Sequence, residues 1–360
     1  MKPASCARLR RGFTLVELLL AMGLFSLLLV VLMRLLDSTL GTLRSAGEER
    51  ERFVRESALF EFLGRDLERL ASGSAADLLL STRRFDVDGD GIAGRPWQRL
   101  VFVRQVPPGE RPGAPAGSDP ARTLALAEVC WTVLPRAVPR QVEGAAGRRG
   151  DGLLVRLERP LDEGGLSLFA PEAFGAGGVP RQAYEELGAG VLWLEVLCAA
   201  QTTRLDQGWN RGHGLEQAPP AWDARGGARL SAEADPENAL HPALPGAVSG
   251  EVFLPRRIRI ELELEREDEH RRRTYNTAPI GPAATQFQVA RPGRLPPAGS
   301  LVLLGEEWMR LESLEGNLVR VSRAQRGTRA VRHGAGTPVQ FGGRAVREFE
   351  IPWAKERWLR

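Results

Sequence analysis

Residues 10–34 read RRGFTLVELLLAMGLFSLLLVVLMR, and this stretch decides how the fold begins. Within it, residues 13–33 hold a single charged side chain, that of Glu17. A run of about 20 apolar residues forms a helix long enough to cross the hydrocarbon core of a bilayer. Basic residues before the run favour a cytoplasmic N-terminus, with the rest of the chain beyond the membrane. They are Lys2, Arg8, Arg10 and Arg11.

Two other kinds of N-terminal segment share part of this pattern. A cleaved secretory signal has a basic start, but its apolar stretch is usually shorter and ends in a small-x-small cleavage site, which is not convincing here. A plain signal anchor explains the length and the flanks and gives no reason for Glu17. Because a carboxylate inside a membrane helix costs roughly 2.5–3.5 kcal/mol on insertion scales, Glu17 needs a partner or a role.

Cleavage between Gly12 and Phe13 would supply a partner for this carboxylate. The new α-amine has a reference pKa of about 7.7–8.0, so it is largely protonated at neutral pH. It lies one helical turn from Glu17 and can neutralise the carboxylate within one subunit or from a neighbouring subunit.

Residues 11–18, Arg-Gly-Phe-Thr-Leu-Val-Glu-Leu, resemble the class III signal of the type IV pilin family, which includes the pseudopilins of type II secretion. In that family a membrane aspartyl peptidase cuts after the glycine and methylates the new phenylalanine, and the glutamate pairs with the N-terminus of the adjacent subunit. The resemblance implies that Gly12 is the cleavage position, Phe13 the methylated residue and Glu17 the assembly carboxylate. It implies the prepilin peptidase and other pilins as partners. It places the protein in the bacterial inner membrane, with its bulk periplasmic, and then in a pilus or pseudopilus.

An amphipathic helix is expected to follow the membrane span. Five apolar residues recur at intervals of seven, three, four and three, which places them on one helix face that can pack on a sheet. They are Phe53, Phe60, Leu63, Leu67 and Leu70. Glycines at 41 and 47 weaken the middle, and Ala-Ser-Gly-Ser at 71–74 ends the helix. We expect a membrane half over 13–33 and a periplasmic half over 34–74.

Later segments change to the two-residue period of strands. Apolar runs rich in Val and Leu predict strands at 100–106, 123–134, 153–157 and 191–197. The clearest strand, 257–265, alternates apolar with charged residues, so we expect one face of its sheet to be wet. Segments dense in Gly, Pro and Ala at 107–120 and 201–250 predict long surface loops. The predicted fold class is α+β, with a long N-terminal helix on the antiparallel sheet of a domain over 75–291.

The order of helix, irregular insertion and sheet, with a strand introduced by Leu-Pro-Arg-Arg-Ile-Arg-Ile at 254–260, resembles minor pseudopilins of the J class and related pilus-tip subunits. Those subunits are usually much shorter. Part of the excess is 292–343, whose segments 301–310, 317–322, 326–334 and 338–341 predict a small all-β unit. That unit is similar to small β-modules of phage tail and other surface-assembly proteins. Because one more strand and a tail follow in 344–360, we expect the unit to be inserted between two strands of the main domain.

Residues 86–94, Asp-Val-Asp-Gly-Asp-Gly-Ile-Ala-Gly, gather carboxylates at alternate positions as a calcium loop does. The ligands would be the side chains of Asp86, Asp88 and Asp90 and the carbonyl of Ile92. The helix-loop-helix form is incomplete, because Trp97 takes the twelfth position where a bidentate glutamate belongs. Such loops also occur as bare turns, so a calcium site and a bare turn both stay open, and we expect no required cofactor.

Cysteine and histidine usage indicates no catalytic site. Cys6 lies in the leader 1–12, which leaves Cys130 and Cys198 in a compartment that permits disulfides. Both lie in apolar runs, where a buried free thiol is as ordinary as a bridge. The four histidines are isolated, and the sequence has no hydrolase elbow, phosphate loop or dinucleotide fingerprint, so we expect no enzyme. The net charge of +4 is distributed among many arginines, and we expect no nucleic-acid partner.

These patterns together predict a minor prepilin-like structural subunit, at or near the tip of a type IV pilus or a type II secretion pseudopilus. A globular part this large would be crowded if it were repeated along a tight fibre, whereas one copy at an end is not. The alternatives are a surface adhesin or cargo-binding module on a pilin stem, and an anchored enzyme.

Overall fold

The structure is a computed structural model that describes residues 15–71, 77–84, 94–107, 125–135, 151–161, 166–170, 173, 183–199, 210–211, 222–224, 254–265 and 273–351. The chain forms two compact units, Met1–Ser57 and Ala58–Arg360. Helix α1 (Leu15–Glu68) continues through Gly41 and Gly47 without a break. It ends before residue 74 because residues 69–71 pair with a strand: the Ala71 amide donates to the Val103 carbonyl at 2.8 Å.

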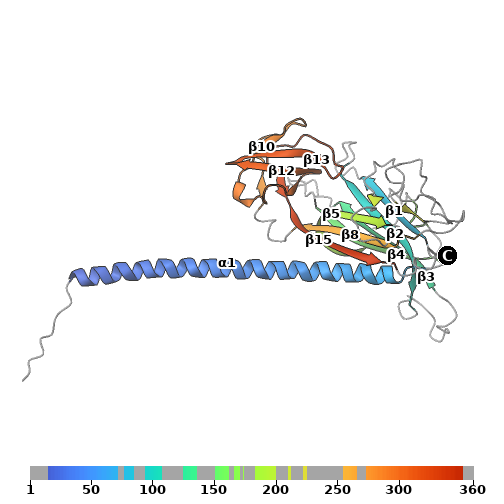
Figure 1. The fold of residues 1–360 in the computed structure, drawn as a ribbon, viewed down its shortest axis with the longest axis horizontal. Helices are drawn as coiled ribbons and strands as arrows, with labels where there is room; N and C mark the ends of the chain where they lie inside the picture. Colours follow the sequence, from blue (N-terminus) through green and yellow to red (C-terminus); the bar gives the residue numbers. More distant parts are fainter. Residues whose placement is uncertain are drawn as a thin grey trace, which may run out of the picture. The chain divides into compact units, whose positions relative to one another are not determined.

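The larger unit contains a nine-stranded antiparallel sheet (Figure 1). Its strands are β1 (Leu78–Arg84), β2 (Pro96–Val106), β3 (Ala125–Pro135), β4 (Gly152–Pro160), β5 (Glu185–Ala199), β6 (Asn210–Arg211), β7 (Trp222–Asp223), β8 (Arg257–Glu265) and β15 (Gly342–Glu350). Their order is β15-β8-β5-β4-β3-β2-β1-β7, and β6 pairs with β5. The α+β class and the five strands predicted over 100–265 are confirmed, whereas β1, β6 and β7 were not anticipated.

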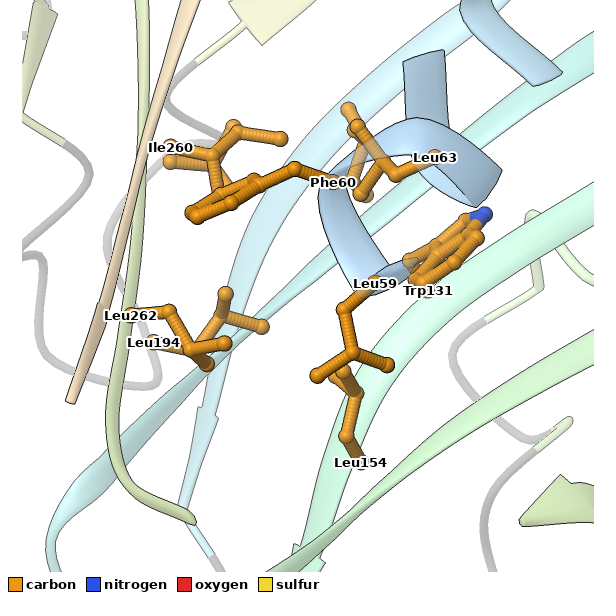
Figure 2. A pocket seen from close by; sticks show the side chains of 10 residues that line it. Leu59, Phe60, Leu63, Trp131, Leu154, Leu194, Ile260 and Leu262 are labelled. Atoms are coloured by element: carbon orange, nitrogen blue, oxygen red, sulfur yellow. The ribbon is translucent and has the colours of Figure 1, made fainter. Parts of the chain in front are cut away.

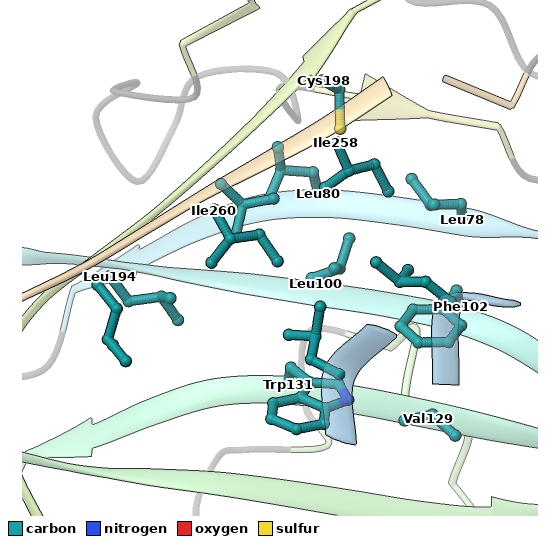
Figure 3. Close-up of a cluster of buried hydrophobic side chains, with 14 of the residues drawn as sticks. Leu78, Leu80, Leu100, Phe102, Val129, Trp131, Leu194, Cys198, Ile258 and Ile260 are labelled. Atoms are coloured by element: carbon teal, nitrogen blue, oxygen red, sulfur yellow. The ribbon is translucent and has the colours of Figure 1, made fainter. Parts of the chain in front are cut away.

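The main hydrophobic core lies on one face of this sheet (Figure 3). Alternate residues of neighbouring strands supply it, for example Leu78 and Leu80 of β1, Leu100 and Phe102 of β2, and Val129 and Trp131 of β3. The end of α1 and the residues after it cover this face with Leu59, Phe60, Leu63, Leu67 and Leu70. The predicted apolar helix face is therefore confirmed from Phe60 onward, whereas Phe53 belongs to the other compact unit.

A second, six-stranded antiparallel sheet forms the inserted module, defined here as residues 274–340. Its strands are β9 (Thr274–Tyr275), β10 (Gln286–Gln288), β11 (Leu301–Leu304), β12 (Glu307–Glu315), β13 (Leu318–Gln325) and β14 (Pro338–Gln340), with a short 3-10 helix η6 (Pro292–Arg294). The order is β10-β13-β12-β11-β14-β9, and the module has its own hydrophobic core.

The inserted module interrupts a pair of adjacent strands. β8 and β15 pair along their whole length, from Glu265 opposite Gly342 to Arg257 opposite Glu350. The structure thus contains the expected insertion, but it begins at Thr274 and not at 292. The earlier start was missed because β9 and β10 are two and three residues long and show no apolar period.

The charged face of β8 is buried, contrary to the expectation of a wet face. Glu261, Glu263 and Glu265 are 6%, 5% and 5% exposed. Each carboxylate is paired: Glu261 with Arg344 at 2.6 Å, Glu263 with Arg326 at 2.7 Å, and Glu265 with Arg273. Two of these arginines come from β15 and from the module, so the alternation along β8 alone could not show that the face is covered.

Candidate functional site

The N-terminal segment carries the predicted processing and assembly residues. Gly12 and Phe13 lie outside the described residues, and α1 begins two residues later, at Leu15. Glu17 lies in the first turn of α1, where the helix dipole favours a negative charge. Its neighbours Val16 and Leu18 are 72% and 55% exposed.

The apolar part of α1 is a candidate membrane span. Leu15–Leu40 is a helical segment of 26 residues. In its most apolar stretch, none of the residues is buried within the structure. The hydroxyl groups of Ser26 and Thr39 donate to carbonyls four residues earlier, at 2.9 and 2.8 Å, so these polar side chains are satisfied inside the helix. An apolar surface of this length needs lipid or other apolar helices around it, and the length and composition of the segment are consistent with membrane anchoring.

A small cavity lies under the part of α1 that covers the nine-stranded sheet (Figure 2). The cavity volume is about 20 Å³. Its lining comes from α1 and five strands, and consists of Leu59, Phe60, Leu63, Leu100, Trp131, Leu154, Leu194, Val196, Ile260 and Leu262. A space of this size could hold one water, but water needs polar partners that these side chains do not offer. The cavity is a packing gap and is unsuited to binding a polar substrate.

A buried ionic network joins the end of α1 to the sheet. Asp66, 1% exposed, accepts hydrogen bonds from Arg156 Nε at 2.7 Å and Nη2 at 3.1 Å, and from Trp131 Nε1 at 2.9 Å. Glu158 accepts from Arg156 Nη2 and from Arg104 Nη2, both at 2.6 Å. Burial lowers the pKa of Arg156, but its hydrogen bonds to Asp66 and Glu158 outweigh burial and raise it overall. The network fixes the helix on the sheet.

A second buried network lies in the inserted module. Glu307, fully buried, accepts hydrogen bonds from Arg323 Nε at 2.8 Å and from the Val331 amide at 3.1 Å, and His333 Nε2 lies 2.8 Å from its Oε2. Burial raises the pKa of Glu307, but the hydrogen bonds from Arg323, His333 and Val331 outweigh it and lower that pKa to about 2. Both oxygens are engaged within the module, so this network is structural.

The structure corrects the disulfide alternative for Cys130 and Cys198. Both are free, buried thiols. β4 separates their strands in the sheet, and Cys198 lies in the core beneath α1 whereas Cys130 lies in the cluster on the other face. Burial raises the pKa of the Cys130 thiol to about 12 and raises that of Cys198 as well.

The proposed calcium ligands Asp86, Asp88, Asp90 and Ile92 lie outside the described residues. Within the part of the chain that the structure describes, no three His, Cys, Asp or Glu side chains are grouped so as to hold a metal ion. Calcium at 86–92 therefore stays a prediction.

An apolar helix that begins beside a basic, glycine-containing flank and continues into a β-rich head is the arrangement expected of a prepilin-like protein. In agreement, residues 7–33 match a family model described as the prokaryotic N-terminal methylation motif. No curated protein and no solved structure matches the chain. The motif supports a prepilin-like subunit of the type IV pilin or pseudopilin kind, processed by prepilin peptidase and assembled with other pilins. It favours a structural subunit over an enzyme.

Proposed function

We propose that the chain is a minor prepilin-like subunit, cleaved after Gly12, methylated at Phe13 and incorporated at or near the tip of a type IV pilus or type II secretion pseudopilus. One observation carries the proposal. The methylation motif at 7–33 coincides with the start of an exposed apolar helix that has Glu17 in its first turn.

In this proposal Glu17 selects and registers the neighbouring subunit. A carboxylate within lipid is tolerated when a cation compensates it, and the ammonium of a cleaved neighbour at Phe13 is such a cation. The apolar span then packs against the spans of other subunits. The basic residues before the span support a periplasmic position for the bulk of the chain.

The size of the globular part supports a position at the tip, as in J-class minor pseudopilins. Beyond α1 the chain carries a nine-stranded sheet and the inserted six-stranded module. A head of this size would be crowded at every position of a narrow fibre, and at an end it meets fewer neighbours.

Mass spectrometry of the protein isolated from membranes tests the processing step. The expected mature N-terminus is a methylated Phe13. An intact Met1 in cells with active prepilin peptidase would overturn the proposal, because the pairing role of Glu17 depends on a free amine at Phe13.

Replacement of the assembly carboxylate tests incorporation separately from processing. Glu17→Ala should leave cleavage largely intact and reduce incorporation into filaments, since the neighbour's ammonium loses its partner. The measurement is the fraction of mature subunit in sheared filaments. Asp37→Ala, on the same helix but outside the motif, is the matched control and should incorporate normally. Normal incorporation of Glu17→Ala would contradict the assembly role.

The inserted module favours a second candidate, a surface adhesin or cargo-binding module on a pilin stem. The module has its own core and interrupts the β8–β15 pair without contributing a strand to the nine-stranded sheet. Affinity capture with the full chain separates the two candidates. Minor pilins among the captured proteins favour assembly, and an external ligand favours adhesion.

A further inference from the structure

The turn at residues 324–327 of the inserted module has an unusual backbone. Ala324 and Arg326 have φ angles of 56° and 52°, and Gly327 has a φ of 69°. Residues with a side chain seldom adopt this left-handed region, because the Cβ atom crowds the backbone. Such a conformation persists only where surrounding contacts fix it, so the contacts of this turn indicate what it is for.

The side chain of Arg326 is held between two tryptophan rings. Its guanidinium carbon lies 4.9 Å from the ring centroid of Trp193 and 4.3 Å from that of Trp308. The two rings are 6.2 Å apart at 83° to each other, and they are 2% and 0% exposed. Arg326 Nη1 also donates to Glu263 Oε2 at 2.7 Å. Two aromatic faces and one carboxylate are the features of a cation-binding site.

This site lies where the inserted module meets the nine-stranded sheet. Trp193 belongs to β5 and Glu263 to β8, whereas Trp308 belongs to β12 and Arg326 follows β13. Leu192 and Leu303 complete a buried cluster with the two tryptophans. One residue further on, the Gly327 carbonyl accepts a hydrogen bond from Arg84 Nη2 at 2.8 Å, so β1 also holds the turn.

We propose that Arg326 is a latch whose guanidinium fills a cation site formed by Trp193, Trp308 and Glu263, and that filling this site docks the inserted module on the sheet. The left-handed turn is then the geometry that delivers the guanidinium to the rings. A planar guanidinium suits the site because it can stack on aromatic faces and donate to a carboxylate at once, which the compact ammonium of lysine cannot do equally well. The latch goes beyond the proposed function and does not depend on processing at Gly12.

Thiol labelling of the full chain in detergent can measure docking directly. Leu303 is 0% exposed and lies in the cluster between module and sheet, so Leu303→Cys reacts only when the two separate. The native Cys198 is 0% exposed in the core of the sheet and reports its opening. Labelling at both positions is read in the same sample by mass spectrometry of the peptides.

In the Leu303→Cys chain, Arg326→Ala should raise the labelling rate at position 303 by about tenfold or more and leave that of Cys198 unchanged. Arg326→Lys should give a smaller rise. Millimolar methylguanidinium should restore protection to Arg326→Ala by filling the vacated site, and urea, planar but uncharged, should not. Arg329→Ala is the matched control, because Arg329 is an exposed arginine three residues away.

Three results would overturn the latch. They are unchanged labelling at 303 in Arg326→Ala, an equal rise at 303 and Cys198, and equal rescue by urea and methylguanidinium. If Arg326→Ala does not accumulate, Arg326→Gln is compared with the parent chain in the same way. Glutamine keeps a long polar side chain but lacks the positive charge and the planar set of N–H donors of the guanidinium.

Discussion

Asp66 is a single buried residue that links helix α1 to the nine-stranded sheet. It lies three residues after Leu63 and four before Leu70, on the helix face that packs on the sheet. Its carboxylate is compensated there by Arg156 and by the indole of Trp131. The spacing could have revealed an acid on the apolar face, but its partners come from strands far away in the sequence. The motif that contains Gly12, Phe13 and Glu17 was recognisable because it is a contiguous local pattern, which the family match at residues 7–33 supports.

Neutralising this carboxylate should destabilise the larger unit. Asp66→Asn leaves Arg156 buried with a weakened partner, and breaking a buried ion pair costs about 3–5 kcal/mol. Denaturant unfolding of the full chain in detergent measures the change. Glu61→Gln is the control, because Glu61 pairs with Arg65 at 3.8 Å with both side chains at least 60% exposed, and surface pairs contribute about 0–1 kcal/mol. Equal effects of the two variants would show that Asp66 does not anchor the helix.

Glu307 should make the stability of the inserted module depend on acid pH. Its pKa is lowered to about 2 in the folded state, so the stabilisation is complete above the unfolded value near 4.5 and is lost as the pH falls toward 2. The shift corresponds to about 3 kcal/mol. Unfolding curves between pH 5 and about 2 should show this loss in the parent chain and a flatter dependence in Glu307→Gln. The exposed Glu312→Gln should keep the parent slope, and an unchanged slope in Glu307→Gln would refute the assignment.

At the scale of elements, the two-residue alternation of apolar residues was sufficient to predict where the long strands lie. Residues 257–265 were predicted with the bounds that β8 has, because strict alternation along nine residues is a strong signal. The two-residue strands β6, β7 and β9 carry no such signal. The burial of the charged face of β8 was also beyond the sequence, since alternation shows that two faces differ and not what covers each.

The start of β15 depends on the absence of a side chain. A Cβ atom at Gly342 would lie 2.2 Å from the Leu264 carbonyl oxygen and 2.6 Å from its carbon, both backbone atoms of the paired strand. Gly342→Ala should therefore force the strands apart at this point and cost about 1–3 kcal/mol or more. The measurement is the denaturant midpoint of unfolding. The control is Gly334→Ala, because a Cβ atom there would meet nothing within 4 Å. Matching midpoints for the two variants would be incompatible with this close approach.

At the scale of the whole molecule, the two free thiols report on the integrity of the nine-stranded sheet. Cys130 and Cys198 are 0% exposed on its opposite faces, and burial raises the pKa of each. Because the thiolate is the reactive form, neither should be alkylated in the native chain at pH 8, and both should react together on unfolding. Mass spectrometry after a labelling pulse measures this, and early reaction of one alone would show that the two faces open separately.

The stem and the head of the chain were predictable on different grounds. The stem was recognised from the motif, which the family match at residues 7–33 supports. The α+β class of the head was predicted from the periodicity of its apolar residues, and the insertion was predicted from strand patterns together with the excess length over J-class subunits. The contacts that hold the head together, such as Arg326 between Trp193 and Trp308, join residues 18 to 133 positions apart in the sequence. No local pattern encodes such contacts.

The pairing of β9 with β14, with Thr274 opposite Val339, brings the entry and the exit of the inserted module side by side. A segment joined at two neighbouring points can be exchanged for another of different length without altering the register of the strands that frame it. The sequence between β8 and β15 could therefore differ in length or content among related chains while the nine-stranded sheet keeps its register.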